Sequence, residues 1–159
     1  MDIKSFNIKD FIDGYGSGIA EQREGRRKDT NEVFTPFEII EDMCSKIPEE
    51  DWADPEKTFL EPSFGNGNIV LYIIWKRLAA GIDWETAINT LYGTELMEDN
   101  CLECKSRIMH LFDNLGIDYD EDLLMDNMDK QLVNTDFFKW DFENWKPINN
   151  IESKSLQLF

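Results

Sequence analysis

The sequence predicts an α/β fold in which helices flank a parallel sheet. Three short apolar runs, at residues 58–60, 91–96 and 132–135, have the composition of strands, and each has an acidic side chain at its carboxyl end. Helical patterns separate these runs, and strands that alternate with helices imply parallel pairing through right-handed crossovers. The 159 residues are enough for one domain with its own core.

The chain is strongly acidic, with 33 Asp and Glu residues against 16 Lys and Arg and a formal charge of −17. The simplest interpretation is an acidic, solvated surface. Because affinity for nucleic acid comes largely from Lys and Arg, this charge opposes direct DNA binding, and we expect DNA to be a partner only indirectly. There is no run of about 18 apolar residues and no signal-peptide pattern, so we expect a cytoplasmic protein without a membrane partner.

The cysteines give no evidence of a disulfide framework, because Cys44, Cys101 and Cys104 are an odd number. Cys101 and Cys104 form a Cys-x-x-Cys within a helical apolar pattern, and no second pair accompanies them. We interpret them as half-buried helix cysteines and predict no metal site. Metal or redox chemistry is the alternative.

Residues 1–31 have the composition of an N-terminal arm. A short helix is predicted at 8–15, and the glycines that follow it break the pattern. Residues 23–28 then contain the chain's basic cluster of three arginines and one lysine. This cluster is either a solvated face or a contact for phosphates or for an acidic partner.

The main domain is predicted over residues 32–146, and its first element is a helix. Thr35 suits the N-cap, Pro36 suits the first helical position, and Pro48 ends the pattern. One face of this helix is expected to contain Ile39, Ile40, Met43 and Ile47. A polar connection at 51–57 then leads to the first strand.

A glycine loop follows the first strand. The chain reads Glu61-Pro-Ser-Phe-Gly-Asn-Gly-Asn68, and an apolar helical pattern runs on to about residue 80 with Gly81 as its C-cap. Gly65 and Gly67 allow the backbone to come close to a ligand, and the helix N-terminus near Asn68 favours an anionic group. This arrangement predicts a site that binds a small ligand through main-chain N–H groups.

The second strand, at 91–96, is expected to bring Glu95 to the same edge of the sheet. A brief helix from Asp83 precedes it, and a longer helix at 98–115, closed by Gly116, follows it.

The third strand, at 132–135, is expected to end in Asp136-Phe137-Phe138. Before it, residues 118–129 are densely acidic but lack the glycine and the ligand spacing of a calcium loop.

Four segments therefore stand in a fixed order: Phe34-Thr35-Pro36 before a helix, the glycine loop after the first strand, Glu95 after the second, and Asp136-Phe137-Phe138 after the third. Over residues 32–145 this order resembles the cofactor half of the S-adenosylmethionine-dependent adenine-N6 DNA methyltransferases, a family of DNA methylation and restriction-modification enzymes. The resemblance implies a partial Rossmann-like class I methyltransferase fold and S-adenosylmethionine as the cofactor.

The resemblance also implies a role for each motif. Glu61 would receive the ammonium group of the methionine moiety, Glu95 the ribose hydroxyls and Asp136 the adenine amino group, while the Phe-Thr-Pro segment would close over the methionine end. The implied cofactor-binding residues are Phe34, Thr35, Pro36, Glu61, Pro62, Ser63, Gly65, Gly67, Asn68, Glu95, Leu96, Asp136 and Phe137.

The catalytic motif of that family has no counterpart in this sequence. A fourth strand should end in an Asn-Pro-Pro-aromatic or Asp-Pro-Pro-aromatic tetrapeptide, which orients the target amino group and stacks on a flipped base, and none follows residue 138. We expect no catalytic residue in this chain and a fold truncated after the third strand. The chain would be the cofactor-binding part of a truncated or split methyltransferase, and a second polypeptide would supply the catalytic and target-recognition parts.

A sheet of three parallel strands also leaves the outer edge of the first strand unpaired, which favours self-association or a covering segment. The tail at 147–159 ends in the alternating segment Ser155-Leu-Gln-Leu-Phe159, which could cover that edge.

Two other functions stay open. The chain could be a catalytically inactive methyltransferase-like adaptor whose acidic surface imitates DNA, or a fold for another adenosine ligand, because Glu95 and Asp136 would recognise adenosine and not the sulfonium.

Overall fold

The structure is a computed structural model that describes residues 2–14 and 34–149. Its central sheet contains three parallel strands in the spatial order β1 (Phe59–Glu61), β2 (Leu91–Glu95) and β3 (Leu132–Asn134). The predicted α/β fold with a parallel sheet and flanking helices is therefore confirmed. Each strand lies within two residues of its predicted bounds.

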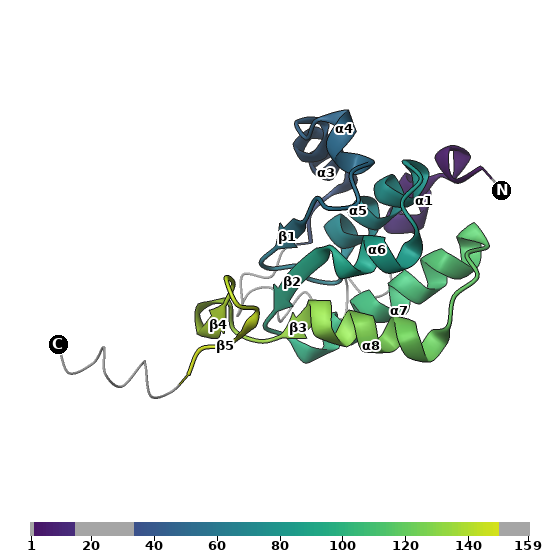
Figure 1. The fold of residues 1–159 in the computed structure, drawn as a ribbon. Coiled ribbons are helices and arrows are strands. Elements are labelled where there is room, and N and C mark those ends of the chain that lie inside the picture. The colour runs from purple at the N-terminus through teal and green to yellow at the C-terminus, as the bar shows by residue number, and fades with distance from the viewer. Residues whose placement is uncertain (1, 15–33, 150–159) are drawn as a thin grey trace.

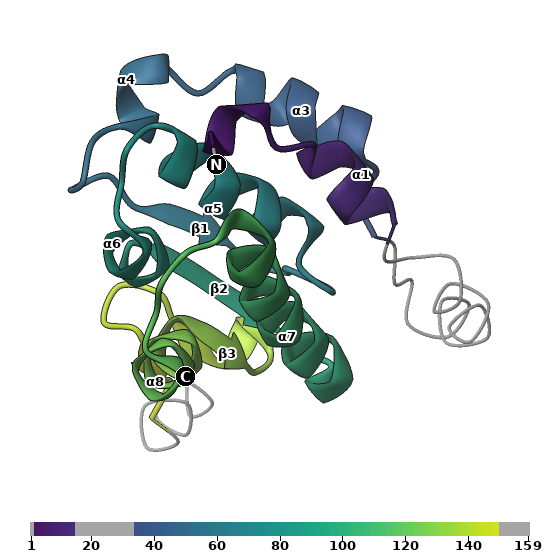
Figure 2. The same cartoon turned by 90° about the vertical axis from the view of Figure 1, so that its right-hand side faces the viewer.

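Helices α5 (Asn68–Ala79) and α7 (Glu98–Leu115) lie in front of the three strands in Figure 2 and cover one face of the sheet. Leu91 and Leu132 of the sheet, Ile74 of α5 and Ile108 of α7 are almost completely buried between these layers. The short helix α6 (Trp84–Asn89) and its N-cap Asp83 agree with the prediction, as does the αL residue Gly116 after α7.

The opposite face of the sheet is open over part of its area. By register, Leu60, Tyr92 and Val133 share this face, and Leu60 is 52% exposed. The hairpin of β4 (Trp140–Asp141) and β5 (Lys146–Pro147), which the sequence did not predict, lies on this side in Figure 1. Its Trp145 packs edge-on against Tyr92, with ring centroids 4.9 Å apart. Within the described residues β1 pairs only with β2, so its other edge is unpaired as expected.

The N-terminal residues pack on the domain. The 3-10 helix η1 (Ile3–Ser5) and α1 (Ile8–Asp13) lie against α5, and Ile8 and Ile12 are buried. This part of the expected arm therefore belongs to the core. The basic cluster at 23–28 and the segment 155–159 lie outside the described residues.

The helix after Pro36 differs from its prediction. Helix α3 (Phe37–Ser45) has Pro36, in an extended conformation, at its N-cap, so Thr35 does not cap it. Its buried residues are Phe37, Ile40 and Cys44, whereas Ile39 and Met43 are exposed. The prediction was right for Ile40, which is buried, and for Ile47, which packs against the core, but wrong for Ile39 and Met43, because the helix packs through the i, i+3, i+7 row that begins at Phe37.

Two helices were missed. Helix α4 (Glu49–Trp52) precedes and overlaps the start of the expected polar connection at 51–57, and it buries Trp52. Helix α8 (Glu121–Gln131) occupies most of the acidic stretch: the Asp120 side chain caps it, acids fill its first turn, and Leu124 and Met128 enter the core. Acidic residues in a first turn complement the helix dipole, which explains why this stretch is helical.

Candidate functional site

The carboxyl ends of the three strands bring three predicted segments to one edge of the sheet. The glycine loop follows β1, Glu95 ends β2, and Asp136 opens the 3-10 helix η2 (Phe137–Lys139) after β3. The Thr135 N–H donates to the Glu95 carbonyl at 3.0 Å, which joins the ends of β2 and β3. Ligands of open parallel sheets bind at this edge, because the loops there extend outward from the strands.

Glu95 is the central acid of this edge. Its Oε2 accepts from the Gly65 N–H at 2.6 Å and its Oε1 accepts from the Met97 N–H at 3.2 Å, while the residue is only 7% exposed. The carboxylate therefore joins the first loop to the second. Since each carboxylate oxygen can accept two hydrogen bonds, acceptor capacity remains for a ligand.

The loop requires glycine at two positions for steric as well as conformational reasons. Gly65 and Gly67 have φ values of +57° and +100°. A Cβ at Gly67 would lie 2.5 Å from Sγ of Cys104, and a Cβ at Gly65 would lie 3.3 Å from the Phe34 ring. The sequence-based interpretation assigned both glycines to ligand approach, but Gly67 also allows α5 to pack closely against α7.

Phe34 and Thr35 lie over the loop and enclose a small pocket with it. The pocket has a volume of about 20 Å³, which is enough for roughly one water molecule. Its walls are formed by Phe34, Thr35, Ser63, Phe64, Gly65, Asn66, Asn68 and Ile69. The Phe-Thr-Pro segment thus lies where it was expected, but the space beneath it is much smaller than a nucleoside.

Glu61 is a second, half-buried acid beside the loop. Its Oε1 accepts from the Ser63 N–H at 3.1 Å. Burial raises the pKa of the Glu61 carboxyl, the negative charge of Glu95 raises it further, and the Ser63 N–H opposes both effects. A cation bound beside the Glu61 carboxylate would favour its charged form.

The residues that follow β2 and β3 present apolar side chains to solvent. Leu96 is 64% exposed and Phe137 is 43% exposed, so neither is a core residue. The Asp136 carboxylate accepts from the Phe138 N–H at 2.9 Å and caps η2, as a strand-end turn residue would. The structure therefore brings Leu96, Asp136 and Phe137 together at one edge without assigning them a ligand.

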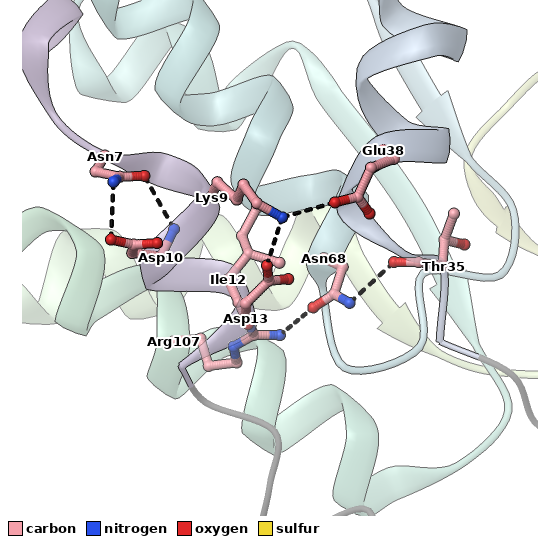
Figure 3. Close-up of polar contacts among 9 residues, drawn as sticks. All are labelled: Asn7, Lys9, Asp10, Ile12, Asp13, Thr35, Glu38, Asn68 and Arg107. Carbon is pink, nitrogen blue, oxygen red and sulfur yellow. Dashed lines mark hydrogen bonds and ion pairs between the residues drawn. The ribbon is translucent and has the colours of Figure 1, made fainter.

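Asn68 connects the loop to two other segments (Figure 3). Its Nδ2 donates to the Thr35 carbonyl at 3.1 Å, and its Oδ1 accepts from Arg107 at 2.7 Å. Sequence reasoning missed Arg107. The available signal was its place within the apolar pattern of α7, beside Cys104, Ile108 and Leu111, because an arginine in such a pattern needs buried acceptors.

The described residues contain no group of three or more His, Cys, Asp or Glu side chains arranged to hold a metal ion. None of the described helices has the length and apolar character needed to span a bilayer. Comparisons with known proteins found no matching family model, no similar curated protein and no similar solved structure.

Proposed function

We propose that this chain is the S-adenosylmethionine-binding part of a DNA adenine-N6 methyltransferase. The observation that carries the proposal is the contact between the Gly65 N–H and the Glu95 carboxylate at the carboxyl edge of a parallel sheet. It joins the glycine loop to a strand-end acid, and in dinucleotide-binding α/β folds an acid at this position recognises ribose hydroxyls. The order of the four sequence motifs supports the same ligand.

Each part of the cofactor has a chemically suitable neighbour. Helix α5 begins at Gly67 without a side-chain cap, so N–H groups of its first turn can bind the methionine carboxylate. The Glu61 carboxylate, near Glu95, suits the ammonium group. The exposed Leu96 and Phe137 offer apolar faces to adenine, and Asp136 can accept from its amino group.

Binding requires the pocket to open. Phe34 packs on Gly65, and the present volume of about 20 Å³ cannot hold the methionine end of the cofactor. The Phe34 side chain is therefore the group that moves away and then covers the ligand. Closure of this kind excludes water from the reacting centre.

Methyl transfer requires an acceptor site as well. The 159 residues contain no Asn-Pro-Pro-aromatic or Asp-Pro-Pro-aromatic tetrapeptide, so the groups that orient the adenine amino nitrogen come from elsewhere. The edge of β1 that no described residue pairs with, and the exposed Leu60 next to it, offer a place for the polypeptide that provides them. We expect methylation only in the presence of that part.

Titration calorimetry tests the proposal with S-adenosylmethionine, S-adenosylhomocysteine and ATP. We expect the first two to bind, Glu95→Ala and Asp136→Ala to weaken binding, and Asp126→Ala to leave it unchanged. Asp126 is a matched control because it is an exposed acid on α8 and its loss changes the net charge equally. If neither methionine-derived ligand binds, the proposal is wrong. Preferential binding of ATP would favour a different adenosine ligand.

The closed pocket favours a second candidate, an inactive adaptor. Both oxygens of Glu95 are used by the protein itself, and the net charge of −17 suits a basic partner. This candidate predicts no binding of either methionine-derived ligand, together with salt-sensitive binding to a cationic DNA-binding protein.

A further inference from the structure

Arg107 of α7 contacts two segments that are far from it in the sequence, residues 66–68 and the end of α1. It belongs to α7, is 1% exposed, and its Nη1 donates to the Asn66 carbonyl at 3.0 Å and to Oδ1 of Asn68 at 2.7 Å. Its Nη2 donates to the Ile12 carbonyl at 3.2 Å. One guanidinium therefore links the glycine loop, the start of α5 and the end of α1. Figure 3 shows Arg107 beside Asn68 and Ile12.

Asn68 links Arg107 to the Phe-Thr-Pro segment that covers the pocket. Because a guanidinium only donates, the Asn68 amide must turn its oxygen to Arg107, and its Nδ2 then faces the Thr35 carbonyl. The orientation of one side chain thus sets the distance between the loop and the Phe-Thr-Pro segment. Figure 3 shows Asn68 between Arg107 and Thr35.

The glycine loop needs such an external support. Gly65 and Gly67 flank Asn66, and glycine has little conformational preference of its own. The Asn66 carbonyl is held from outside by Arg107, while the Gly65 N–H is held by Glu95. The loop is therefore fixed at the two peptide groups on either side of the Gly65–Asn66 peptide by side chains from two different elements.

We propose that Arg107 is a positioning residue, which holds the Gly65–Asn68 backbone and, through Asn68, the Phe34–Pro36 segment in the geometry that receives the cofactor. The proposal rests on the proposed function for its ligand, whereas the positioning itself is a property of the protein without ligand. Lysine cannot replace Arg107, because one ammonium group lacks the planar fork that reaches several acceptors.

The connection also reaches the N-terminal helix. The Ile12 carbonyl belongs to the last turn of α1, where a cation is favourable. On the other side of α1, Lys9 pairs with Asp13 and with Glu38 of α3 at 3.0 and 2.6 Å. Packing of α1 and the geometry of the loop are therefore coupled through Arg107.

A second buried arginine provides the control. Arg77 of α5 is completely buried and donates to the carbonyls of Asp51, Trp52 and Asp54 and to Oγ1 of Thr90, so its contacts lie at and after α4 and before β2, not at the loop. Arg107→Lys and Arg77→Lys both replace a guanidinium that donates to several buried carbonyls with a single ammonium group. A purely structural role predicts the same consequences for both.

Three measurements distinguish a positioning role from a purely structural one: amide hydrogen exchange without ligand, thermal unfolding and titration with S-adenosylmethionine. We expect both lysine variants to lower the Tm. Exchange at the Gly65 and Gly67 amides should be about tenfold faster in Arg107→Lys than in Arg77→Lys. Cofactor binding should be weakened about tenfold in Arg107→Lys alone. Asn68→Ala removes the contacts of Asn68 to Arg107 and to the Thr35 carbonyl but leaves the Arg107 contact to the Asn66 carbonyl. It should therefore speed exchange at the Gly67 amide less than Arg107→Lys does, and it tests the connection through Asn68 if Arg107→Lys does not fold.

Equal exchange at these amides in the two lysine variants would overturn the positioning role, and unchanged exchange in Asn68→Ala would overturn the connection through Asn68. If the unmodified protein does not bind S-adenosylmethionine, the proposed function fails, and the exchange experiment still decides the role of Arg107.

Discussion

The Gly65 N–H lies 2.6 Å from Oε2 of Glu95, so the acid that ends the second strand holds the loop that follows the first. Glu95 therefore has two tasks if the proposed function is right: it supports the loop, and it accepts from a ligand. A ligand that engages this carboxylate must share it with the Gly65 N–H or replace that contact.

Glu95→Gln should weaken S-adenosylmethionine binding by about ten- to hundredfold, because hydrogen bonds to a charged acceptor are stronger than those to a neutral amide. The amide oxygen can still accept from the Gly65 N–H, but the amide nitrogen then faces the Met97 N–H, so the variant should keep the contact to the glycine loop and lose the contact to Met97. Calorimetric titration measures the loss, with Asp126→Asn as the charge-matched control. Unchanged affinity in Glu95→Gln would show that the ligand does not use this carboxylate.

Glu61→Gln should change stability in a pH-dependent way. Because the folded pKa of Glu61 is raised, the native state holds its proton more strongly than the unfolded chain does, and stability falls as pH rises through the interval between the unfolded and folded pKa. The glutamine variant lacks this loss and keeps an oxygen for the Ser63 N–H. Its Tm should exceed that of the unmodified protein at pH 7, and the difference should shrink towards pH 4.

The same substitution should weaken cofactor binding, since the variant loses the negative charge that would receive the ammonium group. Thermal scans from pH 4 to pH 8 and calorimetry measure the two effects separately. A Tm difference that stays constant across this range would contradict the raised pKa.

Gly67→Ala should destabilise the protein far more than Gly81→Ala. The two glycines have almost the same φ, +100° and +95°, but a Cβ at Gly67 would lie 2.5 Å from Cys104 Sγ, whereas a Cβ at Gly81 meets nothing within 4 Å. Both substitutions cost about 1–2 kcal/mol for backbone conformation. Overpacking adds about 1–3 kcal/mol at Gly67.

Urea unfolding measures this difference. Adding Cys104→Ala to Gly67→Ala should recover part of the loss, because it removes the nearest atom. Equal costs at the two glycines would mean that α5 and α7 can separate to admit a methyl group.

The three cysteines should be unreactive in the folded protein. Burial raises the pKa of the Cys44 thiol to about 11 and of the Cys101 thiol to about 12, and it also raises that of Cys104, so little thiolate exists near neutral pH. Iodoacetamide at pH 8 should modify them slowly in the native state and rapidly in urea, as mass spectrometry would show. Rapid modification of Cys101 or Cys104 by iodoacetamide in the folded protein would support the alternative that this pair has redox chemistry.

Local patterns were sufficient for most of the fold. The three strands, the helix at 98–115 with Gly116 behind it, and the helix after the glycine loop follow from periodicity and capping residues. Helix α8 was missed although Asp120 and the acids after it form a normal helix start, because the acidic stretch was weighed only as a calcium loop. Ile39 and Met43 were predicted on the buried face of α3 but are exposed. Periodicity alone does not say which of two neighbouring rows of side chains packs against the core.

The sequence by itself determined the order of the strands and helices and the place of the glycine loop and the strand-end acids, because these depend on neighbours a few positions away. Only the tertiary structure decided that Glu95 holds Gly65, that Gly67 faces Cys104 and that Arg107 supports Asn66 and Asn68. These partners are 30 to 41 positions apart. Their contacts depend on how α5 and α7 pack against the sheet, which no local pattern encodes.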